Sequence, residues 1–179
     1  MTSHQKNFKG FLLCFIFVLS VFCLFGCGNS ENNEPNALED MALVDVIEDI
    51  YGIVPVDLGL FTDSLDTTDS EMMPFYTGLT DLSHVKEAAF SEPMISSQAY
   101  SMVIVRVDDE ANTADVAAAM KSGINPRKWV CVEADDLQVV SYRDVVLLFM
   151  VSSTLSDVVT SQDIVDAFKQ VCGSDVTSY

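Results

Sequence analysis

The stretch LQVVSYRDVVLLFMVS, residues 137–152, decides the fold. It holds two runs rich in β-branched and large apolar residues, 137–142 and 145–152, which flank the polar pair Arg143–Asp144. Two such runs separated by two polar residues have the spacing of a β-hairpin with a tight turn. Residues 145–151 contain no polar side chain, so we predict that they form the central strand of a sheet covered on both faces.

Further strands are predicted elsewhere in the chain. Residues 98–107 (QAYSMVIVRV) end in a β-branched run, and residues 87–92 could form a short strand before them. Residues 129–133 (WVCVE) alternate in polarity, which favours another strand. Arg106 stands between two valines of its run, so we expect its side chain on the opposite face of the strand, toward solvent.

Three longer helices accompany these strands. Residues 38–51 have an apolar face at helical spacing, and Gly52 is expected to end that helix. Residues 112–122 form a second predicted helix, and Thr160 with Asp163 matches the capping box of a third. Consecutive strands near the end of the chain imply antiparallel pairing. We therefore predict the α+β class, an antiparallel β-sheet with helices packed on it.

The N-terminus has the layout of a secretory signal peptide. Residues 1–10 hold two lysines and no acid, and residues 11–25 are apolar except for one serine. A membrane span needs about 20 apolar residues, so an uncleaved signal anchor is the alternative that we do not favour. Leu24–Cys27 (LFGC) resembles the lipobox of bacterial lipoproteins, in which the cysteine is lipidated after cleavage.

This pattern predicts the organisation of the whole chain and its location. We expect a lipoprotein signal peptide, a lipidated Cys27 followed by a flexible tether, a single α+β domain and a C-terminal tail, over residues 1–26, 27–37, 38–173 and 174–179. The lipid would hold the protein on the outer, extracytoplasmic face of the cell membrane.

Charge narrows the range of partners. The chain has 27 acidic and nine basic residues, a formal net charge of -18. Nucleic-acid binding needs Lys and Arg to neutralise phosphates, so we predict no nucleic-acid partner. An acidic surface also disfavours docking on anionic lipid headgroups. The membrane is therefore expected as a partner only through the lipid on Cys27.

Four stretches of the chain carry a family resemblance: EPMISS (92–97), VIVRV (103–107), INPRKWVCV (124–132) and DVVLL (144–148). They resemble a family of lipoproteins catalogued as domain of unknown function 4358, found mainly in Clostridia-like Gram-positive bacteria. The resemblance extends over roughly residues 40–171, and PRKW is its most distinctive segment. It implies a lipid-anchored extracytoplasmic domain. It implies no activity, and it identifies no catalytic residue.

Two clusters are candidates for ligand binding. Four acids in a turn-rich region, Asp63, Asp66, Asp69 and Glu71, have the oxygen density that Ca²⁺ prefers, but they do not match the EF-hand pattern. We interpret them as a solvated acidic loop, with weak cation binding as the alternative. The segment Arg127-Lys128-Trp129 could present a cation and an aromatic ring to an anionic or sugar-like ligand. The alternative is a strand-entry segment with Trp129 packed on the sheet and the cations reaching to solvent.

Catalytic signals are weak. His84 is the only histidine after residue 27, and it lies in a polar turn without a nucleophile motif, so we expect a surface histidine. Cys131 and Cys172 could form a disulfide outside the cell or stay free as small buried hydrophobes.

These signals predict a binding module rather than an enzyme. We predict no cofactor, no metal and no catalytic residue, and a non-catalytic module that binds a partner protein or envelope component. The alternative is a small-molecule or metal-binding accessory lipoprotein, for example to a transporter. A third, less favoured reading is an envelope hydrolase that uses carboxylates.

Overall fold

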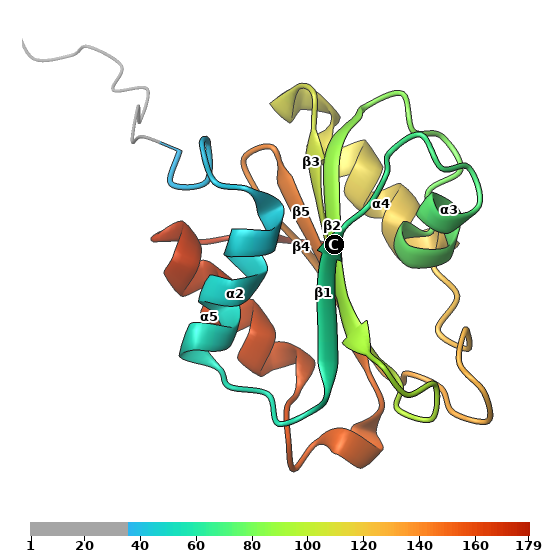
Figure 1. Cartoon of the computed structure of the whole chain (residues 1–179). Coiled ribbons are helices and arrows are strands. Elements are labelled where there is room, and N and C mark those ends of the chain that lie inside the picture. The colour runs from blue at the N-terminus through green and yellow to red at the C-terminus, as the bar shows by residue number, and fades with distance from the viewer. Residues whose placement is uncertain (1–35) are drawn as a thin grey trace, which may run out of the picture. The chain divides into compact units, whose positions relative to one another are not determined.

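The computed structural model describes residues 36–179, and the predictions for residues 1–35, including the lipidation of Cys27, lie outside this range. The described chain forms a six-stranded antiparallel sheet with the strand order β1-β2-β3-β5-β4-β6 (Figure 1). The strands are β1 (Leu60–Ser64), β2 (Val85–Pro93), β3 (Tyr100–Val107), β4 (Asp136–Tyr142), β5 (Val145–Val151) and β6 (Thr177–Ser178). The predicted α+β class is confirmed.

Four α-helices cover the two faces of the sheet, two on each face (Figure 1). They are α2 (Leu43–Ile53), α3 (Met72–Thr77), α4 (Thr113–Gly123) and α5 (Ser161–Cys172), with the short 3₁₀ helices η1 (Glu110–Asn112) and η2 (Ser153–Leu155). Helices α2 and α5 pack on one face, and α3 and α4 pack on the other.

The hairpin of β4 and β5 forms as predicted. Tyr142 pairs with Val145 across the Arg143–Asp144 turn, and Arg143 has a positive φ of 52°. Every residue of β5 is buried. Leu147 belongs to the core under α2 and α5, whereas Leu148 belongs to the core under α3 and α4. Strand β5 is therefore the doubly covered strand that its continuous apolar sequence predicts.

The helix ends agree in part with the sequence. The capping box of Thr160 and Asp163 is present at the start of α5. Helix α2 begins later than predicted, at Leu43, because residues 37–40 form a turn instead. Gly52 does not end α2, which continues to Ile53. The prediction for residues 112–122 is close to α4, although the Asn112 side chain makes no capping hydrogen bond.

Other expectations at the strands are wrong or incomplete. Residues 129–133 form no strand, because Cys131 has a φ of 63°, which an extended strand cannot accommodate. Strand β1 forms in a region predicted only as turn-rich. The sequence predicts a C-terminal tail over residues 174–179, but Thr177 and Ser178 pair with β4 as a short edge strand.

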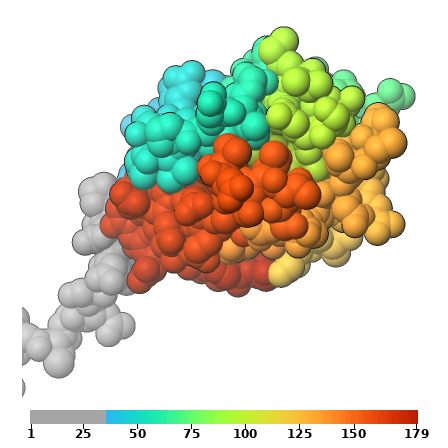
Figure 2. Space-filling model, turned by 90° about the horizontal axis from the view of Figure 1, so that it is seen from below, coloured from blue at the N-terminus to red at the C-terminus, as the bar shows by residue number. Residues whose placement is uncertain are grey.

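The two ends of the sheet differ in the segments that lie there. At the entry end the described chain begins, and Asn36 Nδ2 donates to Asp144 Oδ1 in the β4–β5 turn over 3.2 Å. At the opposite end, which we call the distal end, lie the loop after β2 (residues 94–99) and the loop after α4 (residues 124–135). Figure 2 is a view from this end and shows these two loops side by side, in yellow-green and light orange.

Candidate interaction surface

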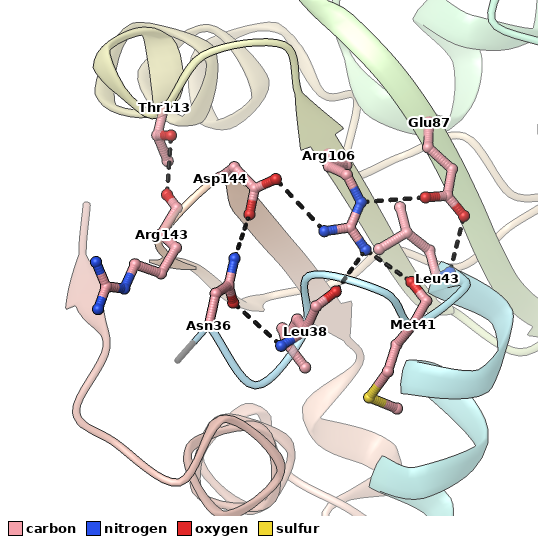
Figure 3. Close-up of polar contacts among 9 residues, drawn as sticks. All are labelled: Asn36, Leu38, Met41, Leu43, Glu87, Arg106, Thr113, Arg143 and Asp144. Carbon is pink, nitrogen blue, oxygen red and sulfur yellow. Dashed lines mark hydrogen bonds and ion pairs between the residues drawn. The ribbon is translucent and has the colours of Figure 1, made fainter. Parts of the chain in front are cut away.

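Arg106 organises the entry end and is 3% exposed, so the prediction that it faces solvent is wrong (Figure 3). Its side chain does lie on the face opposite its valine neighbours, but the segment before α2 covers that face. Its guanidinium Nη2 donates to the carbonyl oxygens of Leu38 at 3.0 Å and Met41 at 2.7 Å. Sequence alternation identified the correct face of β3 and could not show that the chain folds back over it.

Two carboxylates complete the surroundings of Arg106 (Figure 3). Its Nε lies 3.2 Å from Glu87 Oε2, and its Nη1 lies 3.4 Å from Asp144 Oδ2. The other Glu87 oxygen accepts from the Leu43 backbone N–H at 2.9 Å, where α2 lacks a side-chain cap from its own N-cap residue. The guanidinium of Arg106 thus pairs with two carboxylates and two main-chain carbonyls. These interactions hold the start of the described chain against β2, β3 and the β4–β5 turn.

Lys128 is the buried cation of the distal end. Its side chain is 1% exposed, and its Nζ lies 2.5 Å from Glu92 Oε1. The same nitrogen donates to Ser101 Oγ at 3.3 Å. Burial lowers the pKa of Lys128, while the adjacent Glu92 carboxylate partly opposes this shift. Within residues 36–179, Glu92 Oε1 has no hydrogen bond, so the ion pair is what compensates its burial.

Three aromatic rings surround the Lys128 ammonium. Its Nζ lies 4.9 Å from the ring centroid of Phe75, 5.0 Å from that of Tyr76 and 5.4 Å from that of Trp129. Ammonium groups at these distances from ring faces gain cation–π stabilisation, which is larger where water is excluded. Sequence analysis singled out Lys128 and Trp129 together, and the structure brings them together, but their partners are the chain's own rings and carboxylate.

The aromatic cluster continues across the sheet to the edge strand β1. The ring of Tyr76 lies 5.0 Å from that of Phe75 and 4.2 Å from that of Phe90, and Phe90 lies 5.9 Å from Phe61. Phe61 stands opposite Glu92 in the β1–β2 register, so both side chains project from the same face of the sheet. The rings thus form one continuous row from α3 to β1.

Large apolar side chains around this row are exposed to solvent. Met94 is 80% exposed and Val130 is 65% exposed, and their loops meet where the Val130 N–H donates to the Ser96 carbonyl at 3.3 Å. We call the set the distal apolar surface, and it consists of Phe61, Met72, Phe75, Met94, Ile95 and Val130. Exposed apolar side chains gathered in this way mark interaction sites, whereas isolated ones need no explanation.

The structure does not present Arg127, Lys128 and Trp129 as a ligand-binding cation and ring. Arg127 is exposed and forms an ion pair with Glu133, while Lys128 is buried. The alternative interpretation also fails in part, because Trp129 is only half-buried, no strand begins here, and Lys128 does not reach to solvent. Of these residues, Lys128 instead lies against the rings of Phe75, Tyr76 and Trp129.

The acidic residues between β1 and α3 serve local hydrogen bonding. Asp66 Oδ1 accepts from the Thr68 backbone and hydroxyl groups, which lowers the pKa of Asp66. Asp69 Oδ1 accepts from two backbone N–H groups at the start of α3, and Asp63 Oδ1 accepts from the next backbone N–H. In the part of the chain that the structure describes, no three His, Cys, Asp or Glu side chains are grouped to hold a metal ion. The weak candidates Asp63, Asp66, Asp69 and Glu71 are therefore not gathered into such a group.

His84 and the two cysteines of the domain are placed as follows. The imidazole Nδ1 of His84 lies 3.3 Å from Asp108 Oδ1 and 3.0 Å from Asn112 Nδ2, in an exposed cluster on the surface. Cys131 is exposed and Cys172 is buried, and the two thiols are not paired. Burial raises the pKa of Cys172 to about 12.

Comparisons with family models, curated proteins and solved structures find no match for this chain. The resemblance to domain of unknown function 4358 therefore stays a prediction. Over residues 36–179, no helix is both long and apolar enough to cross a membrane.

Proposed function

We propose that this protein is a lipid-anchored extracytoplasmic lipoprotein whose domain is a non-catalytic binding module. The gathering of exposed apolar side chains at the distal end is the observation that carries the binding role. The anchoring role rests on the signal-like residues 1–26 and the lipobox-like sequence before Cys27.

The positions of the two ends support this proposal. The described chain begins at Asn36, which is hydrogen-bonded at the entry end, whereas the distal apolar surface lies at the other end of the strands. Strand β3 has eight residues, and at about 3.4 Å per residue it separates the two ends by about 27 Å. A tether that joins the domain at Asn36 begins at the entry end, about one strand length from the distal apolar surface.

The lipid anchor is tested by replacing Cys27. Cells that produce the full chain are grown with an alkyne analogue of palmitate, and the protein is then isolated and probed for the label. We expect the wild type and a Cys23→Ala control to be labelled and to sediment with membranes. Cys27→Ala should carry no label and should accumulate as an unprocessed precursor.

External protease added to intact cells checks the side of the membrane. We expect the anchored protein to be degraded without cell lysis. Label that persists in Cys27→Ala, or complete protection from protease, contradicts the proposed anchoring and location.

A further inference from the structure

We infer that the partner of the distal apolar surface is a basic amphipathic segment of another protein, in which apolar side chains alternate with Lys and Arg. This inference rests on the proposed function and adds the chemistry of the partner. It is carried by the charge around the surface, together with the exposed apolar side chains themselves.

The domain has few cations to offer a partner. Residues 36–179 hold 25 of the 27 acidic residues and seven of the nine basic residues. Four of the basic side chains are already in ion pairs with the domain's own carboxylates: Arg106, Arg127, Lys128 and Lys169. The field around the domain is therefore strongly negative, and it favours encounter with a positively charged partner.

Two acidic side chains lie close in the chain to members of the distal apolar surface and form its acidic border. Asp63 follows Phe61 by two residues on β1, so the two side chains lie on the same face of the strand. Glu71 immediately precedes Met72 at the start of α3. Both acids are exposed. Lys128, the cation nearest to the rings, is buried and paired with Glu92, so it offers no exposed charge to an acidic partner.

An apolar surface with an acidic border matches a segment with the opposite arrangement. Burying the apolar side chains supplies affinity, and Lys or Arg at the border would pair with the carboxylates and set the orientation. A second copy of this chain has the same acidic border, so the two borders would repel each other. An anionic lipid surface is disfavoured for the same reason.

Photo-cross-linking on intact cells tests the inference. A benzophenone amino acid replaces Ile95 on the distal apolar surface in the full chain, and a matched variant carries it at Ile53, an exposed apolar residue on the opposite face of the sheet. After irradiation, the cross-linked segment of the partner is sequenced by mass spectrometry. We expect an adduct from position 95 and none from position 53, on a segment with more basic than acidic residues.

Charge variants make the test specific. The double variant Asp63→Asn, Glu71→Gln should lower the yield of this adduct at least about twofold, since exposed ion pairs contribute modestly and together. Asp69 is kept, because it accepts hydrogen bonds at the start of α3. The control variant Glu48→Gln, Asp49→Asn removes the same charge from exposed positions on α2 and should leave the yield unchanged.

The outcomes separate this inference from the proposed function. If the cross-linked segment is acidic or neutral, or if the border variant leaves the adduct yield unchanged, the inference of a basic partner is overturned. Binding at the distal apolar surface would then still stand. Adducts with a second copy of the chain or with lipid also overturn the inference of a basic partner. Equal or absent adducts at positions 95 and 53 contradict binding at the distal apolar surface itself.

Discussion

Arg106 at the entry end and Lys128 at the distal end are both withdrawn from water, and their surroundings differ. Their side chains are 4% and 1% exposed, respectively. Arg106 is held by two main-chain carbonyls and two carboxylates, and it binds segments that are far apart in sequence. Lys128 is held by one carboxylate, one hydroxyl, the main-chain carbonyl of Phe75 at 3.5 Å and three rings that belong to a partly exposed surface.

The difference shows how to interpret a buried ion pair. The planar guanidinium has donors in a fixed fork, which suits several acceptors at once, whereas the ammonium is a compact charge that needs fewer directed partners. Main-chain carbonyls cannot move away without unfolding the segment, so Arg106 is a structural element. Lys128 has one such acceptor, the Phe75 carbonyl at 3.5 Å, and its rings and single carboxylate can repack around another side chain. We therefore expect replacement of Lys128 to disturb the fold less than replacement of Arg106.

Replacing Arg106 should have the largest effect on stability. In Arg106→Met, two carbonyls and two carboxylates lose their shared donor, and breaking such a buried network costs about 3–5 kcal/mol. Urea unfolding of residues 36–179, which hold the whole described core, measures this loss by circular dichroism. Arg106→Lys keeps the charge but loses the fork, so it should lie between the wild type and Arg106→Met. A loss of less than about 1 kcal/mol in Arg106→Met would contradict the structural role.

Replacing Lys128 should have a smaller effect. Lys128→Met leaves Glu92 unpaired, but the apolar side chain can pack on the rings, and the cost of burying the ammonium disappears. We expect a loss of about 1–3 kcal/mol, followed in urea through the fluorescence of Trp129, the only tryptophan. The double variant with Glu92→Gln should recover part of the loss, because the unpaired charge is gone. A loss of stability as large as that of Arg106→Met would contradict the expected difference between Arg106 and Lys128.

The sequence predicts the elements that depend on local pattern. The β4–β5 hairpin, the central position of β5 and the capping box of α5 each follow from residues that are close together in the chain. The burial of Arg106 could not be predicted in this way. It depends on carbonyls of Leu38 and Met41, more than 60 residues away, which the sequence does not mark as acceptors.

The distal apolar surface could be predicted only in fragments. The sequence marks the PRKW segment as distinctive, and Lys128 and Trp129 of this segment do lie together. Phe61, Phe75 and Met94 come from three other segments, and an exposed apolar residue cannot be distinguished from a core residue by its own type. The alternating residues 129–133 predicted a strand. They form a loop in which Val130 and Cys131 are exposed and Val132 packs against the core.

Cys131 and Cys172 add a comparison between an exposed and a buried thiol. Among the changes discussed, we expect these two cysteines to have the smallest effect. Cys131 is exposed in the distal loop, whereas Cys172 is buried in the last turn of α5. A thiol reagent added to folded residues 36–179 should modify Cys131 rapidly and Cys172 only after unfolding. Rapid modification of both thiols would show that the core around α5 opens readily.

Alkaline pH tests the same buried thiol through stability. Folding raises the pKa of Cys172 from 9.0 to about 12, so the folded state holds this proton more tightly than the unfolded chain. The stability linked to the thiol is therefore fully present below pH 9 and is lost as the pH rises toward 12. Cys172→Ala should cost about 1 kcal/mol at pH 7, the scale of one small buried group, and should lose stability less steeply above pH 9. Cys131→Ala should follow the wild type, and the slope that remains in Cys172→Ala should come from Tyr51, Tyr76 and Tyr100, whose pKa values are also raised by burial.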